Sequence, residues 1–311
     1  MIMHRGDQTL AIRALKSAAP YIRMYKGKTF VVKAGGGVFA ERDLTRTLVE
    51  QIGILHYFGV RVVLVHGGGP QLTELATALG VPTQMVDGRR VTDARSIDVT
   101  AMVLNGLINT QLLAMCRDLN VDAVGISGVD AGLVRAHKRP PVRVSEDGPP
   151  VDYGFVGDID AVDTTVIRKL LDNGLMPVVS PLSADESGTL LNINADTVAA
   201  AIGAALDAEK LILCTGTPGI LGSVSDPGSL ISYTDLAGLK RLREAGRIAD
   251  GMLPKTRAIE DALRGGVRRV HVVSYRAPEG ILGEVFTNEG TGTLIVSDIN
   301  ALTQAEQQST S

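Results

Sequence analysis

Two short apolar segments near the start of the chain each run directly into a glycine triplet. Residues 29–33 lead into Gly35-Gly36-Gly37, and residues 61–65 lead into His66 and the triplet at 67–69. Apolar residues at helical spacing follow each triplet. A strand, a glycine loop and a helix in this order predict a parallel βα unit, because parallel strands need a long and usually helical crossover. The repeat therefore predicts an α/β fold.

The alternation of helices and strands continues through most of the chain. Residues 136–157 are rich in proline, glycine and charge, which indicates a loop or short hairpin strands, and a polar tail begins at residue 297. We expect helices over 9–25, 44–55, 72–79, 93–119, 161–173, 196–206, 233–245, 251–264 and 279–286, and strands over 29–33, 61–65, 121–126, 175–180, 210–214, 268–273 and 293–296.

Composition excludes several classes of protein. With 311 residues, of which 45% are hydrophobic and 21% charged, the chain is long and apolar enough for two packed lobes. A net charge of −3, 4% aromatic residues and no tryptophan give no basis for binding nucleic acid. We expect no membrane span and no signal peptide, reduced cysteines at 116 and 214, and hence a cytoplasmic protein.

The first glycine loop carries a candidate phosphate site. Lys33 ends a predicted buried strand beside Gly35 and Gly36, at the edge of the sheet where open α/β folds bind ligands. Glycine lets the backbone approach an anion, and its N–H group can bind a phosphate oxygen. The second loop, with Gly68 and Gly69, repeats this order, so the two loops can face each other across one phosphoryl group. A tight turn with a solvated lysine is the alternative.

Further candidates lie near other predicted helix starts. Asn194 is a typical N-cap, and Asp196 complements the helix dipole; in the functional interpretation Asn192 donates to a substrate and Asp196 orients nearby lysines. Lys255 lies early in another helix, where a positive side chain is unfavourable unless an anion is bound. Arg90 can bind a carboxylate through two guanidinium nitrogens, or it is a surface arginine.

Several other common sites are missing from the sequence. Ile22 stands where a Walker P-loop ending at Gly27-Lys28-Thr29 needs a glycine. No dinucleotide-binding glycine motif follows a strand, and there is no Gly-x-Ser-x-Gly elbow. The five histidines lack the spacing of metal ligands, so we predict no metal held by the protein, and His66 has a structural alternative.

Eight motifs, taken together and in order, resemble those of the amino-acid kinase family, most closely its members that phosphorylate N-acetyl-L-glutamate. The resemblance covers residues 10–296 and implies a three-layer αβα sandwich around a mostly parallel open sheet, with a kinked N-terminal helix. The motifs begin at Lys33, His66, Gly88, Gly125, Asn192, Thr217, Gly251 and Gly292.

The resemblance also implies domains. It gives a helical extension for oligomerisation (1–28), an acyl-amino-acid lobe (29–205), an ATP lobe (206–296) and a polar tail (297–311). The implied reaction transfers the γ-phosphoryl group of ATP to the side-chain carboxylate of N-acetyl-L-glutamate, in arginine biosynthesis, with Mg²⁺ held mainly by the phosphates. Phosphoryl transfer needs positioning and charge neutralisation, and an ionised carboxylate needs no general base.

Roles of individual residues follow from the same resemblance. They comprise a catalytic group, a phosphate-binding loop, a site for the acyl-amino acid and a site for the nucleotide. The implied catalytic residues are Lys33, Lys255 and Asp196; Gly35 and Gly36 bind phosphate, Gly68, Gly69, Arg90 and Asn192 bind the substrate, and Thr215 and Gly219 bind the nucleotide.

Several positions depart from the family pattern. In the first loop, Ala34 stands where the family usually has a large residue, and Gly37 is an extra glycine. Val129 stands where many members have a lysine. Gly216 stands where the family usually has an aspartate that contributes to the nucleotide site. Loss of this aspartate argues for a weaker affinity for ATP, or for a phosphoryl donor other than ATP.

Two other functions stay open at this stage. A kinase for acetylaminoadipate or another N-blocked acidic amino acid differs only in pocket shape, and sequence does not resolve one methylene. The second alternative is a non-catalytic arginine-sensing module, as found fused to acetylglutamate synthases. The retained Lys33, Lys255 and Asp196 argue against that module.

The two ends of the chain resemble arginine-inhibited members of the family. Residues 10–25 resemble the kinked N-terminal helix that joins dimers of those relatives into a hexameric ring, and the alternative is a helix folded back onto its own subunit. Glu284, Glu289 and Gly290 resemble the segment that holds arginine, although Glu279 replaces a common histidine. We therefore predict a homo-oligomer, a dimer or a hexamer, with L-arginine as an effector.

Overall fold

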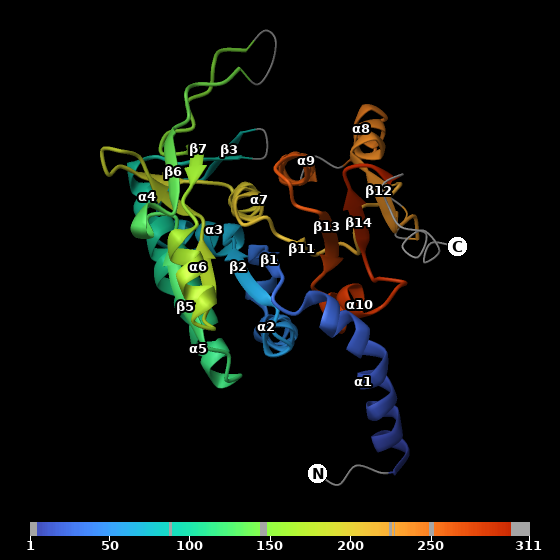
Figure 1. Cartoon of the computed structure of the whole chain (residues 1–311). Helices are drawn as coiled ribbons and strands as arrows, with labels where there is room; N and C mark the ends of the chain where they lie inside the picture. Colours follow the sequence, from blue (N-terminus) through green and yellow to red (C-terminus); the bar gives the residue numbers. More distant parts are fainter. Residues whose placement is uncertain are drawn as a thin grey trace.

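The computed structural model describes residues 5–86, 89–143, 148–223, 226, 228–248 and 252–299. Gly88 and Gly251, which begin two of the motifs, lie outside the described residues, as does the predicted tail beyond residue 299. The rest of the chain forms a sheet with helices on both faces (Figure 1).

The central sheet has eight strands. Neighbouring strands are parallel throughout, except that β13 and β14 are antiparallel. In sheet order the strands are β12 (Tyr233–Asp235), β14 (Thr293–Val296), β13 (Arg269–Ser274), β11 (Lys210–Thr215), β1 (Thr29–Ala34), β2 (Arg61–His66), β8 (Met176–Ser180) and β5 (Ala123–Ser127).

Two separate hydrophobic cores lie on the two faces of this sheet. In β1, Phe30 and Val32 enter one core and Val31 enters the other, as the alternation of strand side chains requires. The predicted three-layer αβα sandwich is therefore confirmed. The first core is covered by α2 (Arg42–Tyr57), α3 (Gly69–Ala78), α4 (Ala94–Ala101), η2 (Met102–Asn109), α5 (Thr110–Asp118), α10 (Gly280–Phe286) and the end of α1 (Arg5–Tyr25), and the second by α6 (Thr165–Asp172), α7 (Ala195–Ala205), α8 (Leu236–Glu244) and α9 (Leu253–Arg264).

Two small sheets and two short 3₁₀ turns complete the described structure. Most of these strands have only three residues, too few for an alternating pattern to be recognised, and the sequence prediction missed those. The short hairpin strands expected within 136–157 correspond in part to β6 and β7. The small sheets are β10 (Leu190–Asn192), β9 (Leu182–Ala184), β6 (Val134–Lys138) and β7 (Gly157–Val162), and the hairpin of β3 (Gln84–Val86) and β4 (Arg89–Val91); the turns are η1 (Gly36–Ala40) and η3 (Asp130–Gly132).

Two predicted helices begin too early. Residues 161–162 belong to β7, and residues 233–235 form β12 before α8 begins. The side chain of Asp235 accepts the N–H of Gly238 at 2.7 Å and so caps α8, which is why the helix starts there. The predicted helix over 93–119 is continuous, but its middle eight residues form the π-helix η2.

That long helix, residues 94–118, meets the length and apolarity of a membrane span, which the sequence prediction had not recognised. In its most apolar window 44% is buried inside the protein, and core helices of soluble proteins meet the same criterion. Cys116 and Cys214 are both free and buried. Burial raises the pKa of the Cys214 thiol to about 12.

Candidate active site

Asp196 lies between two lysines at the carboxyl edge of the central sheet. Its Oδ1 is 2.9 Å from Nζ of Lys33 and 2.9 Å from Nζ of Lys255. The three residues come from the end of β1 and the first turns of α7 and α9, and they are only 7–8% exposed. Two ammonium groups on one carboxylate leave one positive charge in excess. This buried excess charge fits an anionic ligand.

The electrostatics of the cluster favour a charged Asp196. Burial alone would raise the pKa of its carboxyl, but the charges of Lys33 and Lys255 outweigh burial and lower the pKa to about 2. Burial, and then the charge of Lys33, lower the pKa of Lys255. Lys255 is also the third residue of α9, where the helix dipole is positive. An anion at this point would offset both the charge of Lys33 and the positive end of the helix dipole.

The start of α7 is fixed by Asn194. Its Oδ1 accepts the N–H of Asp196 at 2.8 Å and the N–H of Thr197 at 3.3 Å, so the N-cap interpretation of Asn194 is confirmed. The cap holds Asp196 in the first turn of the helix. Asn194 therefore both begins the helix and sets the position of the Asp196 carboxylate between the lysines.

The two glycine loops lie directly against each other. The Gln71 side-chain amide donates to the carbonyl of Gly36 at 2.9 Å, and the N–H of Gly67 donates to the carbonyl of Ala34 at 2.8 Å. A Cβ at Gly36 would lie 2.9 Å from Cα of Gly68, so no side chain fits there. At Gly35 a Cβ would come no closer than 3.8 Å to Nζ of Lys33.

Gly68 is required by packing. A Cβ there would lie 2.5 Å from Cδ1 of Ile108 and 2.8 Å from Cδ2 of Leu104, both in η2. A Cβ at Gly69 would have nothing within 4 Å. Gly68 therefore lets the second loop pack against the π-helix. Gly69, the first residue of α3, has room for a side chain.

Arg90 and Asn192 lie near the second loop but are not part of the lysine cluster. Arg90 donates to the hydroxyls of Thr83 at 2.9 Å and Thr73 at 2.7 Å, and burial lowers its pKa. Its guanidinium has no carboxylate partner in the described part of the chain. The Asn192 amide lies 3.3 Å from the hydroxyl of Thr92, which directly follows the strand β4 that contains Arg90.

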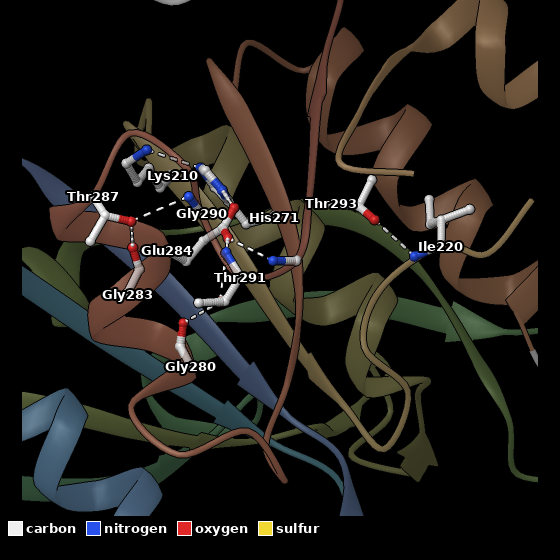
Figure 2. Close-up of polar contacts among 11 residues, drawn as sticks. Lys210, Ile220, His271, Gly280, Gly283, Glu284, Thr287, Gly290, Thr291 and Thr293 are labelled. Atoms are coloured by element: carbon white, nitrogen blue, oxygen red, sulfur yellow. Dashed lines mark hydrogen bonds and ion pairs between the residues drawn. The ribbon is translucent and has the colours of Figure 1, made fainter. Parts of the chain in front are cut away.

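Thr215 is the last residue of β11, and Gly219 lies in the loop that follows it. The Thr215 hydroxyl donates to the carbonyl of Thr217 at 2.8 Å, which closes the start of the loop. The N–H of Ile220 donates to the hydroxyl of Thr293 at 2.8 Å (Figure 2). A Cβ at Gly219 would lie 2.5 Å from that hydroxyl, so packing against β14 explains this glycine.

The predicted arginine segment contains a buried polar network (Figure 2). Glu284 accepts a hydrogen bond from Nδ1 of His271 at 2.6 Å, and Nε2 of that ring accepts one from Lys210 at 2.9 Å. Burial would raise the pKa of Glu284, but the interaction with His271 and the N–H groups of Thr291 and Gly292 together outweigh burial, and the pKa falls to about 2. Gly290 has a φ of +65° and lies beside this carboxylate, whereas Glu289 is exposed and has no contact with it.

His66 has a structural environment. The Asn109 side-chain amide donates to the carbonyl of Val178 at 3.0 Å and to Nε2 of His66 at 3.2 Å. The other ring nitrogen therefore carries the proton and faces the carbonyl of Gly67 at 3.2 Å. Burial lowers the pKa of His66 to about 4, so the ring is neutral at pH 7. This network anchors the strand from which the second glycine loop begins.

A family model described as the amino acid kinase family matches residues 28–274. The chain belongs to this family. A relative named acetylglutamate kinase, from Myxococcus xanthus, is 50% identical over 289 residues, which cover 92% of this chain and 94% of the relative. Membership of the amino acid kinase family is thus shown over most of the chain.

Two solved structures resemble this member of the amino acid kinase family. N-acetylglutamate synthase from Neisseria gonorrhoeae complexed with coenzyme A and N-acetyl-glutamate has a TM-score of 0.80 and 29% identity, and covers 92% of this chain. The same synthase complexed with coenzyme A and L-arginine has a TM-score of 0.71 and 28% identity, again over 92% of this chain. The chain spans 63% and 65% of the length of those synthase chains.

Some polar residues of this amino acid kinase fold were not recognised in the sequence. Lys210 and His271 lie inside apolar strands, and a charged residue in such a strand is the signal that could have identified them. Tyr275 directly follows β13, and nothing in the sequence relates it to a glycine loop. Within the described residues there is no cluster of three or more His, Cys, Asp or Glu that could hold a metal ion.

Proposed function

We propose that this chain is a kinase that transfers the γ-phosphoryl group of ATP to the side-chain carboxylate of N-acetyl-L-glutamate, in arginine biosynthesis in the cytoplasm. The buried cluster of Lys33, Asp196 and Lys255 carries this proposal, because it holds one excess positive charge beside two adjoining glycine loops. The acetylglutamate kinase of Myxococcus xanthus, at 50% identity, supports the choice of acceptor. Both reactants are anions, and the cluster offsets their repulsion.

The proposed reaction needs no general base. A carboxylate oxygen of the acceptor attacks the γ-phosphorus, the bond from this phosphorus to the bridging oxygen breaks, and the electron pair leaves with ADP. No proton moves, because the nucleophile is already ionised. Lys33 neutralises the transferred group, Lys255 neutralises the nucleotide side, and Asp196 holds both lysines. Mg²⁺ held by the phosphates would supply further charge neutralisation.

The remaining assignments follow the arrangement of the loops. Arg90, which has no carboxylate partner among the described residues, binds the α-carboxylate of the acceptor, and Asn192 binds its acetylamino end. Residues 29–205 then bind the acyl-amino acid and residues 206–296 bind ATP. We assign the N–H groups of Gly35, Gly36, Gly68 and Gly69 to the phosphoryl oxygens, and Thr215 and Gly219 to the nucleotide.

An assay for ADP release tests the proposal and separates the acceptors. We expect turnover with N-acetyl-L-glutamate and trapping of the acyl phosphate by hydroxylamine, and the Lys33→Ala variant is the control for background ATP hydrolysis. Faster turnover with N-acetylaminoadipate would change the acceptor. No turnover with either acceptor, together with binding of arginine, would indicate the sensing module instead.

The N-terminal helix supports a proposal on assembly. α1 runs without interruption through Pro20 and projects away from the sheet (Figure 1). Ile12 and Leu15 are 56% and 58% exposed. A second copy of the helix that covers this apolar surface would bury both residues and join dimers into a hexamer. Light scattering of an Ile12→Asp/Leu15→Asp variant should show a smaller particle, with Lys16→Asp as the control. An unchanged mass would contradict the proposed ring.

We also propose L-arginine as an effector that binds near residues 284–290. The tyrosine hydroxyl of Tyr21 in α1 contacts the side chain of Asn288, so the segment adjoins the helix proposed for assembly. The synthase of Neisseria gonorrhoeae, whose structure was solved with L-arginine, supports this choice. In titrations of the kinase assay, arginine should inhibit the natural chain and should inhibit Glu284→Gln less. Flat activity into the millimolar range would contradict the proposal.

A further inference from the structure

The hydroxyl of Tyr275 lies between the two glycines that depart most from the family pattern. A Cβ at Gly37 would lie 2.7 Å from Oη of Tyr275, and a Cβ at Gly216 would lie 3.1 Å from the same atom. The hydroxyl therefore fills the space beside both glycines where a side chain would otherwise begin. One side chain thus relates the extra glycine of the first loop to the missing aspartate of the nucleotide loop.

Three neighbouring strands bring these residues together. Gly37 follows β1, Gly216 follows β11, and Tyr275 follows β13, and β11 pairs with both of the other strands. The backbone N–H of Tyr275 donates to the carbonyl of Thr215 at 2.9 Å, which ties the tyrosine to the nucleotide loop. The carboxyl ends of these three strands lie at the same edge of the sheet as Lys33.

The Tyr275 hydroxyl has no hydrogen-bond partner among the described residues, although the ring is half-buried. The guanidinium of Arg276 lies 5.5 Å from the centre of the ring, and it forms an ion pair of 3.5 Å with Glu41 at the start of α2. Arg276 therefore connects the ring to the segment that follows the first glycine loop.

We propose that the Tyr275 hydroxyl binds a phosphate oxygen of the nucleotide, at the place where the family usually has the aspartate of position 216. The inference rests on the proposed use of ATP. A carboxylate can only accept hydrogen bonds, whereas a phenol can donate one, so the exchange turns this point of the site into a donor. A donor beside Gly37, at the same edge of the sheet as Lys33, matches an anionic oxygen, and it adds no negative charge that would repel the phosphates.

Calorimetry with a non-hydrolysable ATP analogue tests this role. A hydrogen bond to a charged group contributes about ten-fold to affinity, so Tyr275→Phe should weaken binding of AMP-PNP about ten-fold. Binding of AMP and the KM for N-acetyl-L-glutamate should not change. Tyr57→Phe, which removes an exposed hydroxyl bonded to Leu119, is the matched control. Unchanged affinity for AMP-PNP, or an equal loss for AMP-PNP and AMP, would overturn the assignment to a phosphate.

A second substitution tests the steric relation between the two residues. Gly37→Ala should weaken AMP-PNP binding in the natural chain, because the new Cβ would displace the hydroxyl. In the Tyr275→Phe background the nearest ring atom lies 3.6 Å from that Cβ, an ordinary contact, so Gly37→Ala should cause no further loss. Additive losses would contradict the shared position.

The outcomes separate this inference from the proposed function. If the natural chain releases no ADP with any acceptor but Tyr275→Phe still weakens AMP-PNP, the kinase proposal fails and the role of Tyr275 stands. If the natural chain phosphorylates N-acetyl-L-glutamate and Tyr275→Phe binds AMP-PNP normally, only the role of Tyr275 fails.

Discussion

Replacing Asp196 with asparagine should weaken the fold as well as the reaction. The substitution keeps the shape of the side chain but removes the charge that pairs with Lys33 and Lys255 at 2.9 Å. Both ammonium groups then remain in a site where the three side chains are 7–8% exposed. Breaking a buried ion pair by removing one partner is destabilising, because the other charge stays without compensation.

The structure sets the size of this effect. The carboxyl of Asp196 has a pKa of about 2 against an ordinary value of 3.8, and this difference corresponds to about 2 kcal/mol of stability. Loss of one partner of a buried pair costs about 3–5 kcal/mol. We therefore expect Asp196→Asn to lower the free energy of unfolding by about 2–5 kcal/mol at pH 7.

Urea unfolding monitored by circular dichroism measures this change. Asp235→Asn is the matched control, because Asp235 caps α8 without a lysine partner and asparagine caps helices equally well. If Asp196→Asn loses no more stability than Asp235→Asn, the cluster does not contribute as the geometry requires.

The pH dependence gives an independent check of the same cluster. Because the folded-state pKa of Asp196 is lowered, its contribution is fully present above pH 4 and is lost as the pH falls toward 2. The Tm of the natural chain should therefore fall more steeply below pH 4 than the Tm of Asp196→Asn. Parallel slopes for the two proteins would place the carboxylate outside the ionic cluster.

Five other substitutions test neighbouring parts of the site. Lys33→Ala or Lys255→Ala should lower kcat about 100- to 1000-fold with unchanged circular dichroism, and near-normal turnover of both variants would refute their role. Arg90→Lys should raise the KM for N-acetyl-L-glutamate about ten-fold at similar kcat, because lysine lacks the planar fork; an unchanged KM would remove Arg90 from the acceptor site. Gly68→Ala should cost about 1–3 kcal/mol in unfolding experiments, whereas Gly69→Ala should cost less, and equal Tm values would contradict the packing argument.

The long elements of the fold could be predicted because their patterns are local. β1, β2 and β11 are continuous apolar segments, as expected for strands covered on both faces. The three-residue strands β3 and β9 have too few residues for a pattern, and β9 also pairs with a residue about fifty positions away, Arg135 in β6. The long strands of the central sheet were therefore predicted, whereas the three-residue strands were not, including β12 at the edge of the central sheet.

The candidate site divides in the same way. Lys33 and Lys255 stand in motifs whose order along the chain matches a known family, so their meeting at Asp196 could be expected. Tyr275 and Gly37 belong to segments far apart in sequence, and only the pairing of β1, β11 and β13 brings them together. A distance between loops depends on packing, which no local pattern records.

The lysine cluster links the stability of the protein to its proposed ligand. Lys255 lies at the positive end of α9, beside Lys33 and away from water, and each of these factors disfavours its charge. Asp196 balances only one of the two ammonium groups. The unbalanced charge destabilises the protein without a ligand, and an anionic phosphate bound between the glycine loops would neutralise this charge. The features that make this site unfavourable without ligand are therefore the ones that would make it selective for a phosphoryl group.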